Sequence, residues 1–131
     1  LRLLGGFMLL DAKLTRTAGG LTDGREAPGV PKRYINFGAE WDPSALPGWT
    51  LSTRVTVTSS GYVDVANTRR IDGWTRWDAG VRYATRIGGR ETVFRAAIDN
   101  LLNSSYWMVS PGGGFNPVTP RTLRLSAAVD F

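Results

Sequence analysis

The sequence predicts an all-β protein whose strands form an antiparallel up-and-down meander of about six strands. Apolar and polar residues alternate with a period of two through most of the chain. The connections between these segments are alternately long and short. Almost no segment shows the period of 3.6 residues that marks an amphipathic helix. Successive side chains of a strand point to opposite faces, so the alternation gives each strand one apolar and one polar face.

The first strand is expected within residues 3–14, where Met8, Leu10, Ala12 and Leu14 alternate with Leu9, Asp11 and Lys13. The later strands are expected at residues 34–42, 49–59, 77–83, 94–99 and 121–131. In these segments large aliphatic and aromatic residues recur at every second position. They include Ile35, Phe37, Trp41, Trp49, Leu51, Val55, Val57, Trp77, Val81, Tyr83, Phe94, Ile98, Leu123, Leu125, Val129 and Phe131.

The connections alternate in length along the chain. Long segments at 15–32, 60–73 and 101–120 are separated by short turns at 43–48 and at Ile87-Gly-Gly-Arg90, and Gly-Gly is a strong hairpin signal. In an up-and-down meander this order places all the long connections at one end of the sheet. Outer-membrane barrels have that arrangement, with short periplasmic turns and long extracellular loops.

An apolar sheet face can be covered by a second protein layer or by lipid. Three features favour lipid. The strands are about ten residues long, which suits a tilted bilayer crossing. Trp41 and Trp49 flank one turn and Trp77 lies nearer the opposite end of its strand, as in an aromatic belt. The polar faces carry Arg54, Arg82, Arg95 and Arg124, a charged lining that suits a wet lumen, and a lumen-side network is expected among Asp78, Arg82, Arg95 and Arg124.

An open six-stranded sheet cannot stand alone in lipid, because its edge strands leave backbone groups unpaired. The smallest single-chain barrels have about eight strands, and the chain starts at Leu1 without an initiator Met. We therefore expect a piece of a longer protein. The alternative is a soluble β-sandwich that binds a ligand or carbohydrate through exposed Trp.

Composition excludes several functions. The chain has no Cys and no His, so disulfides, thiolate nucleophiles, the usual zinc sites and Ser-His-Asp triads are absent. Asp23, Glu26 and Asp64 show no spacing typical of acid–base catalysis, so we expect no enzyme, no catalytic residue and no metal site. The net charge is +5, but the basic residues are scattered, which argues against nucleic acid as a partner.

Several short motifs occur in a fixed order along the chain. They are Val30-Pro-Lys-Arg-Tyr34, Tyr62-Val-Asp-Val-Ala-Asn67, Ile71-Asp-Gly-Trp-Thr-Arg-Trp-Asp78 continuing to Tyr83, Asp99-Asn-Leu-Leu-Asn103 with Tyr106-Trp107, and Pro120-Arg-Thr122 before a strand that ends in Phe131. Together they resemble the C-terminal part of the TonB-dependent outer-membrane receptors of the ferric-siderophore group, over essentially the whole chain.

The resemblance implies that residues 1–131 are the C-terminal segment of a large transmembrane β-barrel of about 22 strands with a plugged lumen. The plug and the N-terminal strands are then absent from this chain. The implied protein lies in the outer membrane of a Gram-negative bacterium and imports ferric siderophores with energy from TonB. Iron travels as the chelate, and no cofactor is bound directly.

Further partners follow from the same resemblance. They are outer-membrane lipid and lipopolysaccharide, and the barrel-assembly machinery, for which Phe131 resembles the C-terminal recognition signal. An isolated chain of this kind is expected to oligomerise through its apolar face and its open edges.

Loop residues are the candidate ligand contacts, because many ferric siderophores are anionic and carry aromatic rings. The candidates are Tyr62, Arg69, Arg70, Trp74, Tyr106, Trp107 and Phe115. For Trp74, Tyr106 and Trp107 the alternative role is that of an anchor in the membrane interface. Asn100 is expected to turn the chain at the exit of a strand.

Overall fold

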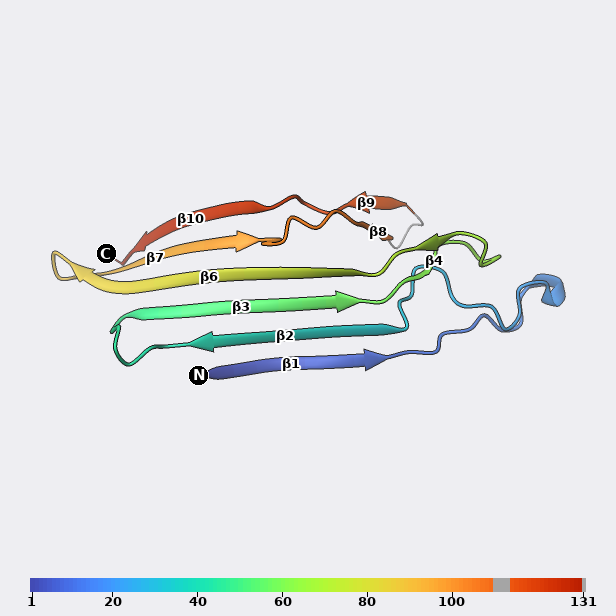
Figure 1. Ribbon diagram of the computed structural model, residues 1–131, viewed down its shortest axis with the longest axis horizontal. Coiled ribbons are helices and arrows are strands. Elements are labelled where there is room, and N and C mark those ends of the chain that lie inside the picture. The colour runs from blue at the N-terminus through green and yellow to red at the C-terminus, as the bar shows by residue number, and fades with distance from the viewer. Residues whose placement is uncertain (110–113, 131) are drawn as a thin grey trace.

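A computed structural model, described for residues 1–109 and 114–130, has a six-stranded antiparallel sheet with the order β1-β2-β3-β6-β7-β10 (Figure 1). The strands are β1 Arg2–Leu9, β2 Arg33–Trp41, β3 Trp49–Thr58, β6 Trp74–Ile87, β7 Arg90–Asp99 and β10 Thr122–Val129. Each strand pairs with the next one in the sheet along the chain. The predicted six-stranded meander is confirmed.

The long connections carry small elements of their own. β4, Gly61–Tyr62, pairs with β5, Arg70–Ile71; β8, Trp107–Val109, pairs with β9, Phe115–Pro117; and a short helix, η1, covers Ala18–Gly20. In Figure 1 these elements lie at the right-hand end of the sheet, while the short turns, the start of β1 and the end of β10 lie at the left. The described residues contain no helix long and apolar enough to span a bilayer.

β6 is longer than the predicted segment 77–83. It pairs with β3 from Trp74 to Tyr83 and with β7 from Ala79 to Ile87. Its two ends are therefore held by different neighbours, which is the stagger expected of tilted strands in a barrel wall. Gly88 and Gly89, with φ of 60° and 82°, close the β6–β7 hairpin in the left-handed conformation that such two-residue turns require.

The prediction for the first strand is wrong in its end and its face. β1 stops at Leu9, and beyond it only Lys13 makes an isolated bridge, to Glu26. β2 starts at Arg33, so the residues after Leu9 have no strand to pair with. Since Phe7 lies opposite Ile35 and Met8 opposite Tyr34, Phe7 shares the apolar face and Met8 lies on the polar face.

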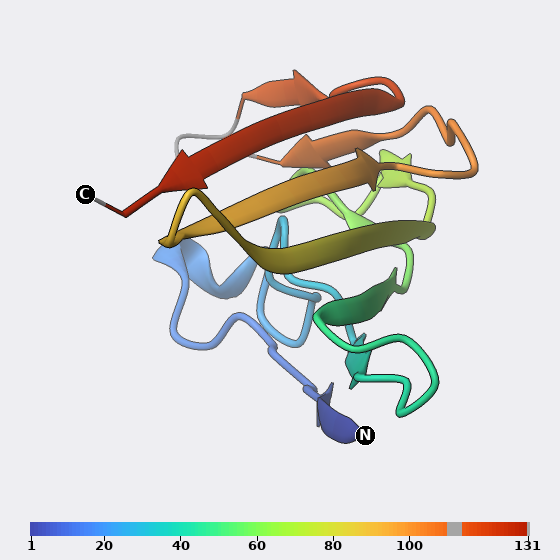
Figure 2. The ribbon, with the colours of Figure 1, turned by 90° about the vertical axis from the view of Figure 1, so that its left-hand side faces the viewer.

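The apolar face of the sheet is uncovered. No hydrophobic residue is buried in the described part of the chain. The exposed side chains of this face are Leu3, Phe7, Leu9, Ile35, Phe37, Trp41, Trp49, Leu51, Trp77, Phe94, Leu123, Leu125 and Val129. Viewed from the short-turn end, the strands follow one another as a single layer (Figure 2). A soluble sandwich would bury this face, whereas Leu125 is 72% exposed and Phe7 78%.

Candidate functional site

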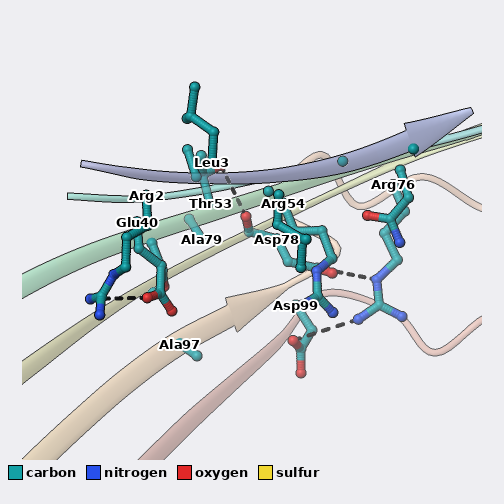
Figure 3. Close-up of a pocket in the computed structure, with 18 of the residues that line it drawn as sticks. Arg2, Leu3, Glu40, Thr53, Arg54, Arg76, Asp78, Ala79, Ala97 and Asp99 are labelled. Atoms are coloured by element: carbon teal, nitrogen blue, oxygen red, sulfur yellow. Dashed lines mark hydrogen bonds and ion pairs between the residues drawn. The ribbon is translucent and has the colours of Figure 1, made fainter.

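The opposite, polar face carries a network of ion pairs around a hollow of about 810 Å³ (Figure 3). The Arg76 side chain pairs with Asp78 at 2.7 Å and with Asp99 at 3.5 Å, and Arg124 pairs with Asp99 at 2.6 Å. At the other end of the hollow Arg2 contacts Glu40 at 3.1 Å. The pairs through Asp99 join the edge strand β10 to β7 and β6, and the Arg2–Glu40 pair joins the other edge strand, β1, to β2.

The network differs from the predicted one. Asp78 and Arg124 belong to it, but they are linked through Arg76 and Asp99, which the sequence analysis did not single out. Arg82 donates instead to the Thr50 hydroxyl at 2.9 Å. The sequence did contain a signal for Arg76. Every second residue from Asp78 through Gly80 to Arg82 lies on the polar face, and Arg76 is the preceding residue of the same series.

Asn100 fixes the chain where it leaves β7. The residue is 1% exposed and its φ is 53°. Its amide nitrogen Nδ2 donates to the carbonyls of Ser104 (2.9 Å) and Thr119 (3.2 Å), and its Oδ1 accepts from the Ser104 backbone. Its own backbone N–H donates to Asp78 at 2.8 Å. The predicted turn role is confirmed, and the polar-face network holds the start of the long connection.

A second hollow, of about 430 Å³, lies at the long-connection end of the sheet. Four of the predicted contact residues line it: Arg70, Trp74, Tyr106 and Trp107. The rings of Trp74 and Tyr106 stack with centroids 4.3 Å apart and planes 8° from parallel. Trp74 has the same strand parity as Arg76 and Asp78, so it lies on the polar face, opposite to Trp77.

Burial raises the pKa of the Tyr106 phenol, and the nearby positive charge of Arg76 opposes this only in part. The phenol therefore stays protonated and neutral at neutral pH, and it keeps a hydrogen-bond donor at the hollow. The Arg70 side chain, which also lines the hollow, donates to the Ser60 hydroxyl. The hollow thus combines stacked rings, a neutral donor and an exposed cation.

The other three candidates lie outside this hollow. Tyr62 pairs with Arg70 across the β4–β5 ladder, and its carbonyl accepts from Gly29 at 2.7 Å. Arg69 is exposed, and its backbone N–H donates to Asp64 at 2.7 Å. Phe115 is exposed and pairs with Val109. The sequence analysis missed Ser104 and Ser105, which line the hollow, because isolated serines in a polar loop carry no distinguishing signal.

The connections 10–32 and 59–73 are joined to each other. Asn67 accepts from the Glu26 backbone N–H at 2.8 Å and donates to the Glu26 carbonyl at 3.0 Å, and Arg25 donates to the Ala66 carbonyl. Lys32 pairs with the Glu26 carboxylate at 2.6 Å, and this hydrogen bond raises the pKa of Lys32. Within the described residues no group of three acidic side chains could hold a metal ion.

Phe131, the candidate assembly signal, lies outside the described residues.

Comparison with known proteins agrees with the fold. Residues 1–101 match the family model described as TonB dependent receptor-like, beta-barrel. The ferrichrome receptor FcuA of Yersinia enterocolitica is 36% identical over 132 residues, which is 99% of this chain and 17% of that protein.

Solved structures give the same result. The ferric preacinetobactin receptor BauA of Acinetobacter baumannii matches with a TM-score of 0.93 and 40% identity over 99% of this chain and 20% of its own. The unliganded ferric citrate transporter FecA, at 24% identity and a TM-score of 0.71 over 85% of this chain and 18% of its own, shares the fold. The chain spans about a fifth of the length of these relatives.

The short-turn end of such a barrel faces the periplasm and the long-connection end faces the cell exterior. The uncovered apolar face is therefore the lipid side, and the polar face is the lumen side. This chain belongs to the TonB-dependent receptor β-barrel family and forms part of a barrel wall in the outer membrane of a Gram-negative bacterium.

Proposed function

We propose that the complete receptor imports a ferric siderophore with energy delivered by TonB, and that the hollow formed by Arg70, Trp74, Tyr106 and Trp107 is part of its outer ligand site. The relatives are named as receptors for ferrichrome and for ferric preacinetobactin. The observation that carries the site proposal is the stacked Trp74–Tyr106 pair, at the extracellular end and on the lumen side of the wall.

The chemistry of the hollow suits a ferric chelate. A ring stacked against a second ring is held in place and offers a flat apolar surface, and aromatic contacts contribute about 0.5–1.5 kcal/mol each. Arg70, which lines the same hollow, supplies positive charge for an anionic chelate. An interface anchor would face lipid, as Trp77 does, whereas Trp74 faces the lumen.

Tyr62, Arg69 and Phe115 remain proposed contacts of lower rank, because they lie on the same side of the membrane but outside the hollow. The iron is cargo in this proposal, held by the siderophore. TonB, the assembly machinery and lipopolysaccharide are proposed partners of the complete receptor.

The test is ligand binding by the full-length receptor in detergent, with ferrichrome and ferric preacinetobactin as probes. Binding is measured by the quenching of protein fluorescence. Trp74→Ala and Tyr106→Ala are each expected to weaken binding of the accepted probe about tenfold, which corresponds to about 1.4 kcal/mol. Phe94→Ala and Trp77→Ala, both on the lipid side of the wall, are the matched aromatic controls. Equal affinity for the accepted probe in all four variants would contradict the proposed ligand site. If the wild-type receptor bound neither probe, the proposal that it takes these siderophores would be wrong.

A further inference from the structure

Most arginines on the lumen side of the described strands have a carboxylate partner. Arg2, Arg76, Arg86 and Arg124 form ion pairs with Glu40, Asp78, Glu91 and Asp99 respectively. Arg54 lies directly opposite Asp78 in the β3–β6 register. Arg54, Arg82 of β6 and Arg95 of β7 form no ion pair within the described residues, and of these three only Arg82 and Arg95 have no acidic residue directly opposite.

Arg82 and Arg95 lie directly opposite each other. Cβ atoms at such positions are about 4.5–5.5 Å apart, and like charges placed so are destabilising. Arg82 has one side-chain partner, the Thr50 hydroxyl, which itself donates to Asp42 at 2.6 Å. Arg95 makes no side-chain hydrogen bond or ion pair with the described residues. Its other neighbour across the sheet is Ser126, which carries no charge.

The surroundings leave both guanidinium groups open to a partner. Both residues are exposed, and the next lumen-side pair toward the loops is Gly80 and Ala97, which have almost no side chain to stand in the way. Arg82 lies in the half of β6 nearer the short turns, so the pair faces the periplasmic part of the lumen. The wall therefore presents two facing positive charges beside a surface of small side chains, and the Asp42 carboxylate, which lies within electrostatic range of Arg82, offsets one of them in part.

We propose that Arg82 and Arg95 form a docking site for an acidic side chain, Asp or Glu, of the domain that fills the barrel lumen. Most of each relative's length lies outside the matched part, and the lumen of large outer-membrane transporters is plugged. A carboxylate accepts two parallel hydrogen bonds from a guanidinium group. One carboxylate between the two arginines offsets their repulsion.

This inference depends on the barrel wall and not on the identity of the siderophore. Its first test is photo-crosslinking in the full-length receptor, with a benzophenone amino acid in place of Arg95 and, as the control, in place of Leu125 on the lipid side. We expect position 95 to crosslink to a segment outside residues 1–131 within a few residues of Asp or Glu. Crosslinks confined to the barrel wall, or to a segment without acidic residues, would overturn the proposal.

The second test measures how tightly the lumen is closed. In the full-length receptor, Arg82→Glu with Arg95→Glu is expected to raise passive entry of a large hydrophilic antibiotic at least fivefold, while Arg82→Lys with Arg95→Lys stays close to wild type. Heat-dependent gel mobility verifies that each barrel is folded. A closed lumen in the glutamate variant would refute the docking role.

A neutral variant distinguishes a docked side chain from a mobile anion. If Arg82→Gln with Arg95→Gln left the lumen closed but slowed uptake, the pair would serve a passing anion, and the proposal would be wrong. Siderophore affinity at the outer hollow is expected to be equal in all these variants. If the receptor turned out not to bind the proposed siderophores, the crosslinking and permeability results would still test the docking site.

Discussion

At the scale of single residues, a few short polar side chains determine how the long connections are held. Asn67 and Asn100 both have positive φ, at 53°, and both use the whole side-chain amide to bond backbone groups of other turns. Asn tolerates this conformation better than other non-glycine residues. The sequence predicted the turn at Asn100 because Asn is a turn residue, but the bonds of Asn67 to Glu26 join residues 41 positions apart and had no local signal.

Asp64 makes the turn after β4 sensitive to acid. Its carboxylate accepts from the Thr68 hydroxyl and from the backbone of Thr68 and Arg69, and these bonds lower the pKa of Asp64 from 3.8 to about 2. A lowered folded-state pKa stabilises the turn above pH 3.8, and this contribution is lost as the pH falls through about 2.

We therefore expect the amide hydrogens of Thr68 and Arg69 to lose protection between pH 4 and pH 2, measured by hydrogen exchange relative to the intrinsic rate. Asp64→Asn, which keeps an acceptor oxygen but cannot titrate there, is expected to give a flat profile. A wild-type profile that is also flat would disprove the role of the carboxylate.

At the scale of elements, alternation was sufficient to predict the strands and insufficient to place their ends. The ends of β6 depend on how far β3 and β7 extend beside it, which a single segment does not contain. The face of β1 was predicted wrongly because Leu3, Leu4, Phe7, Met8, Leu9 and Leu10 are apolar at both parities. Only the pairing of Phe7 with Ile35 selects the face.

The turn between β2 and β3 depends on Gly48. Its φ is 83°, its carbonyl accepts from Ala84 at 2.8 Å, and an added Cβ would collide with the Ala84 carbonyl oxygen. Gly48→Ala is expected to lower the free energy of unfolding by about 2 kcal/mol or more, because a left-handed conformation alone costs about 1–2 kcal/mol.

Alanine substitutions at two other glycines distinguish the cost of backbone strain from the cost of a steric collision. Gly88→Ala, with φ of 60° but open space around the added Cβ, is expected to show only the strain, and Gly6→Ala, without positive φ and with open space, almost no change. The measurement is the urea midpoint of the full-length receptor in lipid vesicles. An equal midpoint for the Gly48 and Gly6 variants would show that the close approach is not maintained.

At the scale of the whole molecule, the uncovered apolar face is the feature that indicates contact with membrane lipid. The sequence predicted it through strands of about ten residues, Trp residues near the strand ends and charged polar faces. It did not contain the outer hollow, because Trp74 and Tyr106 meet only after β6, β7 and the turn at Asn100 have formed.

Arginine substitutions at graded depth test the lipid contact. Leu125→Arg, in the middle of β10 and on the lipid side, is expected to lower barrel stability in vesicles by about 2–4 kcal/mol, and Val129→Arg, at the strand end, by about 0–1 kcal/mol. Ala128→Arg points into the lumen and is the control. Equal losses at positions 125 and 128 would mean that lipid does not cover this side.

The joining of connections 10–32 and 59–73 through Asn67 and Glu26 has a consequence for how such receptors diversify. A chimera that received one connection without the other would leave the Asn67 amide facing a foreign backbone, with two hydrogen bonds to replace. The two connections, 10–32 and 59–73, therefore need to be exchanged together. A change in the length of one connection requires a matching change in the other.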